Sequence, residues 1–85
     1  EPEAEQLLKS LLTKVPSLFR GLARRKVVRE AEELAGERKG NRDVGRDDVI
    51  RAYIRSNAKI TRHRVRAPLL EHGVDPDQYR ADFDW

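Results

Sequence analysis

Apolar residues recur at helical spacing along three stretches of the chain. Residues 2–13 place four leucines and an alanine at positions i, i+3, i+4, i+7 and i+8, which is one face of an α-helix. Val15-Pro16 should end this helix, because the residue before a proline avoids the α region. After a glycine-rich loop, Asp47 or its neighbour is expected to cap another helix that ends near Asn57.

The longest amphipathic segment is a helix predicted over about 16–36. Pro16 suits a helix start because its φ is already near helical and its missing N–H is not needed there. Gly36 is the predicted stop. The apolar face of this helix should pack against the other two helices. The side chains expected to be buried together are Leu8, Leu11, Leu12, Phe19, Ala23, Val27, Leu34, Val49, Ile50 and Tyr53.

The last third of the chain is less regular. A short helix is predicted over 67–73, and Asp75 as N-cap followed by Pro76 should start another. The fold class is therefore all-α: three main helices plus one or two short C-terminal ones. Residues 1–57 are expected to form the main module, and 58–85 a basic and then acidic extension packed on it. Three aromatic residues of this extension should pack on the helices, since free in water they would leave apolar surface uncovered: Tyr79, Phe83 and Trp85.

Charge is unevenly distributed, although the net charge is only +3. Residues 14–29 carry six Lys or Arg and no acidic residue, and residues 51–66 carry six more. The last fifteen residues carry five acidic residues against one arginine, a balance of −4. An acidic tail of this kind is expected to fold back on a basic face.

Composition limits the chemistry and the setting. The absence of cysteine excludes disulfides and thiolate-bound zinc or iron–sulfur clusters. No apolar run approaches the roughly 20 residues of a membrane span, and no segment resembles a signal peptide, so a cytoplasmic location is expected. The chain contains no methionine, and we expect it to be one domain of a longer protein.

Residues that could support catalysis are few. His63 and His72 lack the spacing of metal ligands, and both are expected at the surface. Adjacent carboxylates such as Glu32-Glu33 face apart on a helix and cannot share a proton. No glycine-rich stretch has the strand-to-helix setting of a phosphate-binding loop. We therefore expect no catalytic residue, no metal and no cofactor, and no enzyme activity from this chain alone.

Two arginines stand apart from the surface cations. Arg20 and Arg24 lie four residues apart on the core side of the long helix, where a guanidinium has to be paired. One interpretation pairs them internally, with the loop after the helix or with Glu30, Asp43 or Asp47. The other makes them an anion site for a partner's carboxylate, which a planar guanidinium binds through two hydrogen bonds.

The remaining cations form two clusters. One, around Arg25, lies on the outward side of the long helix, and the other alternates along 62–66. Such clusters are either solvated or internally paired, or they bind an acidic protein or nucleic acid. No aromatic residue is interleaved with them as a base-stacking platform. The candidate partner-binding or anion-binding residues are Arg20, Arg24, Arg25, Arg62, Arg64 and Arg66.

The segment VPSLFRGLARRKVVREA resembles the small helical module at the C-terminus of the B subunit of light-independent protochlorophyllide reductase, which also occurs as short stand-alone bacterial proteins. The resemblance covers roughly residues 4–56, and residues 58–85 have no counterpart in it. The residues that carry it are Val15, Pro16, Phe19, Arg20, Gly21, Ala23, Arg24, Arg25, Ala31, Gly40, Val44, Asp47 and Val49.

This resemblance implies an accessory role in chlorophyll biosynthesis. In that family the catalytic cluster and the pigment pocket belong to the large subunits, and the module aids complex assembly or tetrapyrrole enclosure. The implied partner is a larger protein subunit or the parent chain, and a tetrapyrrole propionate is a possible ligand of Arg20 and Arg24. The alternative function, from the charge pattern, is a basic nucleic-acid-binding helical domain.

Overall fold

The computed structural model describes residues 2–40 and 44–85, with Lys39 described by its backbone alone. Every regular element in these ranges is helical, which confirms the predicted all-α class. The elements are α1 (Pro2–Leu12), α2 (Ser17–Lys39), α3 (Arg46–Ser56), the 3-10 helix η1 (Lys59–Val65), α4 (Arg66–Glu71), the 3-10 helix η2 (Pro76–Tyr79) and α5 (Arg80–Phe83).

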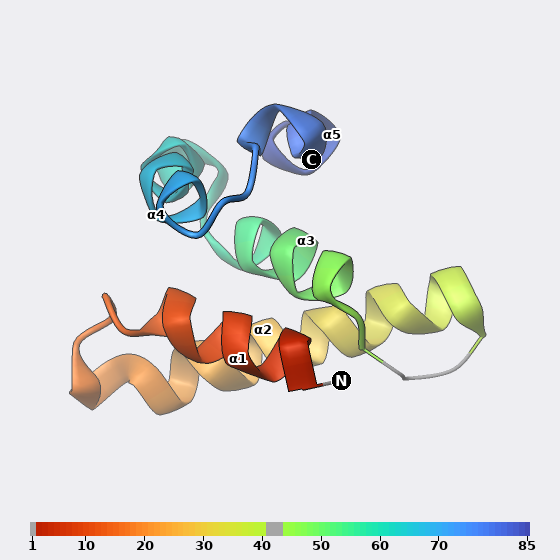
Figure 1. Ribbon diagram of the computed structural model, residues 1–85, viewed down its shortest axis with the longest axis horizontal. Coiled ribbons are helices and arrows are strands. Elements are labelled where there is room, and N and C mark those ends of the chain that lie inside the picture. The colour runs from red at the N-terminus through yellow and green to blue at the C-terminus, as the bar shows by residue number, and fades with distance from the viewer. Residues whose placement is uncertain (1, 41–43) are drawn as a thin grey trace.

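The helices form two layers with α3 between them (Figure 1). α1 and α2 run antiparallel and side by side, joined by a tight turn in which Val15 N–H donates to Leu12 O at 3.0 Å. α3 crosses this pair and packs most extensively on α2. The short C-terminal helices lie on the opposite side of α3 (Figure 1). The central helix therefore has neighbours on both sides.

The long helix runs further than the sequence predicts. Gly36, the predicted stop, lies inside α2, and the helix continues to Lys39. Gly40 ends it with a φ of 74°, and its N–H donates to Gly36 O at 2.9 Å. A positive φ costs glycine nothing, so the second glycine rather than the first takes the cap position.

The N-cap of α3 is Gly45 and not Asp47 or its neighbour, as predicted, although the side chain of the neighbour Asp48 completes the cap. Gly45 is the N-cap, and its N–H donates to Asp48 Oδ2 at 2.9 Å. The Asp48 carboxylate is fully buried and accepts two hydrogen bonds from Arg38, at 2.7 and 3.2 Å. Because Arg38 belongs to the last turn of α2, this pair joins the end of one helix to the start of the next.

The core confirms most of the predicted buried residues and corrects one. Phe19 is 56% exposed, so its predicted burial is wrong, and Ala23 is only half-buried. The buried residues of α2 begin at Val27, near the middle of the helix, and continue through the part that α3 crosses (Figure 1). Residues 17–23, which form the first two turns, include no fully buried side chain. The predicted core residues that are buried are Leu8, Leu11, Leu12, Val27, Leu34, Val49, Ile50 and Tyr53.

The C-terminal third contributes to the same core. Val65, Leu69 and Val74 are buried among the side chains of α1, α2 and α3. Asp75 caps η2 as predicted, accepting a hydrogen bond from Asp77 N–H at 3.0 Å. The predicted aromatic packing holds in part. The half-buried side chains are Tyr79 and Phe83, which pack against the core, whereas Trp85 is 62% exposed.

Candidate interaction surfaces

Arg20 and Arg24 are both engaged by α1. Arg20 Nε donates to Leu12 O at 3.1 Å, and its Nη2 donates to the carbonyls of the next turn at 3.0 and 3.2 Å. These carbonyls have no partner within α1 because the helix ends there. Arg24 Nη2 lies 2.7 Å from Glu5 Oε1. Internal pairing was one of the two interpretations, but the partners differ from those predicted, and the predicted partner Asp43 lies outside the described residues.

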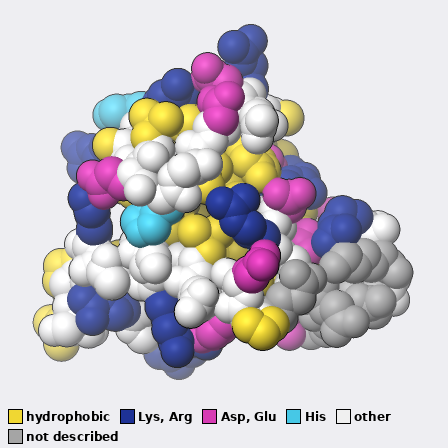
Figure 2. Space-filling view, in the orientation of Figure 1, with side chains coloured by type: hydrophobic (Ala, Val, Ile, Leu, Met, Phe, Trp, Pro, Cys, Tyr) yellow, Lys and Arg dark blue, Asp and Glu magenta, His cyan; other side chains and the backbone are white. Residues whose placement is uncertain are grey.

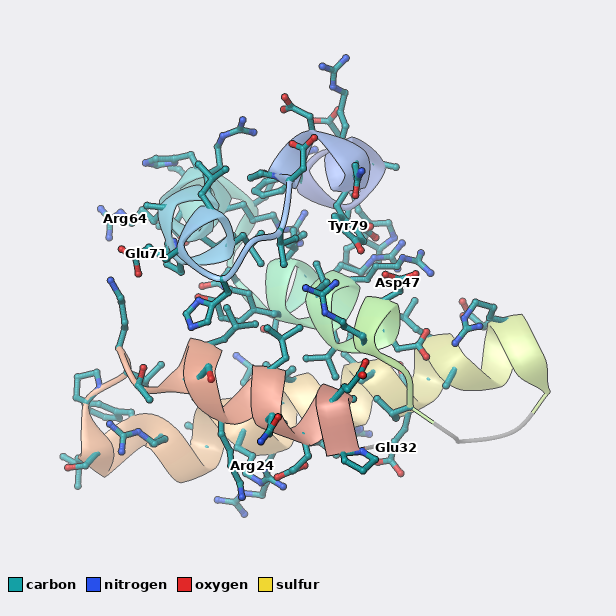
Figure 3. All side chains as sticks on the ribbon, viewed as in Figure 1. Arg24, Glu32, Asp47, Arg64, Glu71 and Tyr79 are labelled. Carbon is teal, nitrogen blue, oxygen red and sulfur yellow. The ribbon has the colours of Figure 1, made fainter. Side chains whose placement is uncertain are left out.

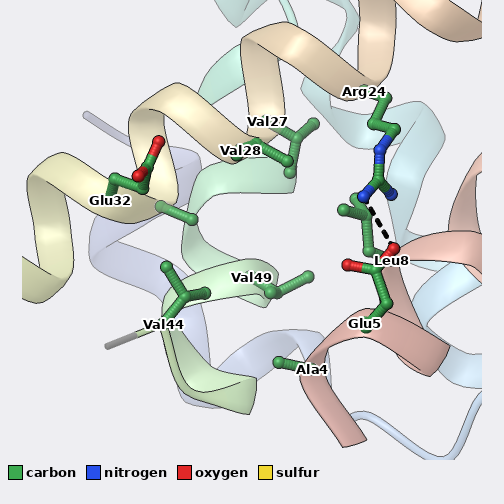
Figure 4. Close-up of a pocket in the computed structure, with 10 residues that line it drawn as sticks. Ala4, Glu5, Leu8, Arg24, Val27, Val28, Glu32, Val44 and Val49 are labelled. Carbon is green, nitrogen blue, oxygen red and sulfur yellow. Dashed lines mark ion pairs between the residues drawn. The ribbon is translucent and has the colours of Figure 1, made fainter. Parts of the chain in front are cut away.

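A small apolar hollow opens beside this ion pair, between α1, α2 and the start of α3 (Figure 4). Its walls are valine, alanine and leucine side chains, with Arg24–Glu5 on one rim and Glu32 on another. The hollow has a volume of about 200 Å³, whereas sites for small organic ligands span about 300–1,000 Å³. It is large enough for one apolar side chain and too small to enclose a tetrapyrrole.

The arginines of residues 62–66 differ sharply from one another, although the sequence places them in one alternating cluster. Arg62, predicted to bind a partner or an anion, is only 5% exposed. Its guanidinium donates to the carbonyls of Asn57, Arg55 and Asp82 at 3.0, 3.2 and 3.3 Å. Arg66 pairs with Asp77 at 3.1 Å on the surface. Arg64 extends from the outer edge of the molecule (Figure 3) and has no partner among the described residues.

The acidic tail folds back on the basic residues of α3. Asp82 is 4% exposed, and its carboxylate accepts from Arg55 Nε at 2.7 Å and from Arg51 Nε at 3.2 Å. At the start of the acidic tail, Glu71 pairs with Lys14 at 2.9 Å. On the face shown in Figure 2, acidic side chains lie between the cationic ones, so the charges do not form one uniform field.

Trp85 lies among cations, which the sequence analysis missed. The Arg55 guanidinium is 4.5 Å from the centre of its ring and the Arg62 guanidinium is 5.6 Å away. Such contacts are attractive because the ring face carries negative charge. The signal available in the sequence was Asp82, three residues earlier, whose carboxylate brings this turn onto α3. Charge pattern alone did not show which cations the tail would reach.

A second exposed surface lies on the first half of α2. Leu18, Phe19 and Leu22 are 84%, 56% and 56% exposed and lie at i, i+1 and i+4, so they form one apolar stripe. Arg25 and Lys26 continue the same face in the next turn, and neither has an ion-pair partner among the described residues. We call these five residues the α2 outer face.

One polar contact ties the C-terminal third to α3. Tyr79 Oη donates to Asp47 Oδ1 at 2.6 Å, and the two side chains point towards each other in Figure 3. Burial, together with the hydrogen bond and negative charge of Asp47, raises the pKa of Tyr79 from 10.0 to about 12. The phenol therefore stays protonated and acts as a donor at physiological pH.

No group of three or more His, Cys, Asp or Glu side chains in the described ranges is arranged to hold a metal ion. His63 is exposed, and His72 is half-buried with Nδ1 2.8 Å from Pro68 O. None of the helices described in residues 2–40 and 44–85 is both long and apolar enough to cross a membrane.

The fold and surfaces define a small all-α domain joined internally by arginine ion pairs and carrying an exposed apolar and cationic helix face. The family model described as "Protein of unknown function (DUF2621)" matches residues 1–83, so the chain belongs to that family. No match was found among curated proteins or among solved structures.

Proposed function

We propose that this domain is an accessory protein-interaction module that docks on a larger protein subunit or on its parent chain. The observation that carries the proposal is the α2 outer face. Three large apolar side chains on two consecutive turns leave a contiguous apolar patch in water, and such patches mark sites of association. The cations in the next turn, Arg25 and Lys26, place positive charge beside this patch. The occupant that fits is a protein segment bearing both apolar and acidic side chains.

The resemblance to the protochlorophyllide reductase B-subunit module supports the same type of role. Phe19 and Arg25, which belong to the resemblance, lie on the α2 outer face. Arg20 and Arg24, also part of it, hold α2 against α1 and so position that face. Of the two roles that the resemblance implies, complex assembly is favoured over tetrapyrrole enclosure, because the hollow beside Arg24 is small.

The experiment uses photo-crosslinking in cells of origin, with the full-length chain carrying a crosslinker at position 22. The crosslinked protein is identified, purified and titrated with the domain by calorimetry. We expect Leu18→Asp to weaken binding at least roughly tenfold, because one buried leucine contributes about 1.5–3 kcal/mol. Ile60→Asp is the matched control, since Ile60 is as exposed as Leu18, at 84%, but lies in η1.

Two results would overturn the proposal. One is equal binding by the Leu18→Asp and Ile60→Asp variants, which would place the interface elsewhere. The other is crosslinking at position 22 to lipid alone, or to a second copy of this chain alone with concentration-dependent dimerisation in sedimentation. Either would replace the larger subunit with a membrane surface or a homodimer.

A further inference from the structure

The hollow beside Trp85 goes beyond the proposed function, because its chemistry differs from that of the α2 outer face, with which it shares only Lys26. It lies between the middle of α2 and the end of α3 and has a volume of about 560 Å³, within the range of about 300–1,000 Å³ typical of ligand sites. Trp85 and Arg55 form one part of its lining, and Lys26 and Arg29 of α2 form another. An exposed aromatic ring and several cations therefore meet in one place.

Two fixed arginine side chains hold the ring of Trp85 in position. Arg55, 4.5 Å from the ring centre, is itself fixed by the buried carboxylate of Asp82 at 2.7 Å. Arg62, 5.6 Å from the ring centre, is fixed by three backbone carbonyls. Trp85 nevertheless stays 62% exposed. A flat apolar surface that is anchored but still open to solvent can accept a second flat group at little cost in side-chain entropy.

The cations of α2 in this hollow are only partly neutralised. Lys26 makes no ion pair or hydrogen bond among the described residues. Arg29 is 3.9 Å from Glu33, a loose contact between exposed groups, which contributes little. The other acidic lining residue, Glu30, is 3.9 Å from Arg55. The two glutamates of the hollow therefore each lie beside an arginine, and Lys26 is left to interact with a ligand.

We propose that this hollow binds a nucleobase together with its neighbouring phosphate, the base stacking on Trp85 and the phosphate lying at Lys26 and Arg29. Aromatic stacking beside a cationic path is how proteins hold single-stranded nucleic acid without reading its sequence. The chemistry is shared by a single strand and by a free nucleotide. These residues, rather than the predicted Arg62, Arg64 and Arg66, would carry nucleic-acid binding in this chain.

The test uses the intrinsic fluorescence of Trp85, the one tryptophan in the sequence. The probes are a short oligothymidylate, thymidine monophosphate, and heparin as a polyanion without bases. We expect saturable quenching by oligothymidylate at low salt, with log K falling linearly against log salt as counterions are released. Quenching by thymidine monophosphate at similar concentration would identify a free nucleotide as the ligand. Quenching by the strand alone would identify single-stranded nucleic acid as the ligand.

Variants separate stacking from general attraction of polyanions. Trp85→Ala should weaken the binding of labelled oligothymidylate roughly tenfold, because one base would no longer stack. Trp85→Phe should retain most of the affinity. Lys26→Glu should weaken binding and flatten the salt dependence. Far-UV circular dichroism should confirm that each variant stays folded, since both residues are exposed. Leu18→Asp should leave oligothymidylate binding unchanged, so this proposal and the protein-docking proposal fail independently.

The proposal is overturned if neither thymidine probe quenches Trp85 at low salt. It is also overturned if Trp85→Ala binds oligothymidylate as tightly as the unmodified protein, or if heparin quenches as strongly as the strand. Either result would mean that the cations attract any polyanion and that the ring takes no part.

Discussion

At the scale of single residues, arginine side chains make many of the links between helices. Arg20 closes the end of α1, Arg38 joins α2 to α3, and Arg55 and Arg62 hold the C-terminal turn. A guanidinium suits this task because its five N–H groups form a planar fork that bridges several acceptors at once. The sequence shows where the cations are, but not that these four bind groups of the same chain rather than a partner.

Tyr79 provides a titration that should report on tertiary structure. Its pKa is about 12 in the folded protein, raised first by burial and then by Asp47, and about 10 in an unfolded chain. Below pH 10 the phenol is protonated in both states, so its contribution to stability is complete. Between about pH 10 and 12 the unfolded state loses this proton while the folded state keeps it, so the free energy of unfolding falls as pH rises.

Chemical denaturation over that pH range should show a smaller fall for Tyr79→Phe than for the unmodified protein. Tyr53, whose pKa burial also raises, is present in both proteins, so the difference isolates Tyr79. Parallel curves for the two proteins would mean that neither burial nor the hydrogen bond to Asp47 raises the pKa of Tyr79 in solution.

At the scale of elements, hydrophobic periodicity predicted α1 and α3 well, including their buried faces. The same pattern failed for the first half of α2. Periodicity shows which side of a helix is apolar, but it does not show how far along the helix a neighbour covers that side. Val27 and Leu34 are buried, whereas Phe19, closer to the start of the helix, is 56% exposed. The 3-10 helix η1 (Lys59–Val65) was also missed, because a 3-10 helix lacks the spacing of an α-helix.

Two substitutions in α2 should therefore differ in cost. Leu34→Ala removes a buried side chain and should lower the free energy of unfolding by about 2–4 kcal/mol. Phe19→Ala, at a side chain that is 56% exposed, should lower it by less than about 1 kcal/mol. Urea denaturation followed by circular dichroism measures both. Equal losses would show that the first turns of α2 are covered in solution.

At the scale of the whole molecule, residues 58–85 contribute side chains to the core and do not merely pack on its outside. Val65 and Leu69 are buried with Leu11 and Ile50 in one cluster, and Asp82 places its charge between arginines of α3. The sequence predicted an acidic tail folded on a basic face, since opposite charges in one short chain attract. It did not predict the pairings, because charge pattern gives sign and approximate place but not which side chains meet.

One shared core in so small a domain predicts one cooperative unfolding transition. A chain of this length buries little more than about 60% of its unfolded surface. Neither residues 1–57 nor residues 58–85 should therefore bury enough apolar surface to fold without the other. The fluorescence anisotropy of Trp85 reports on the C-terminal turn, and far-UV circular dichroism reports mainly on α1, α2 and α3. In urea the two probes should give the same midpoint. A chain shortened to residues 1–57 should lose its cooperative transition, because the buried surface of α3 would face water. An earlier midpoint for Trp85, together with an intact transition in the shortened chain, would instead make residues 58–85 a separable appendage.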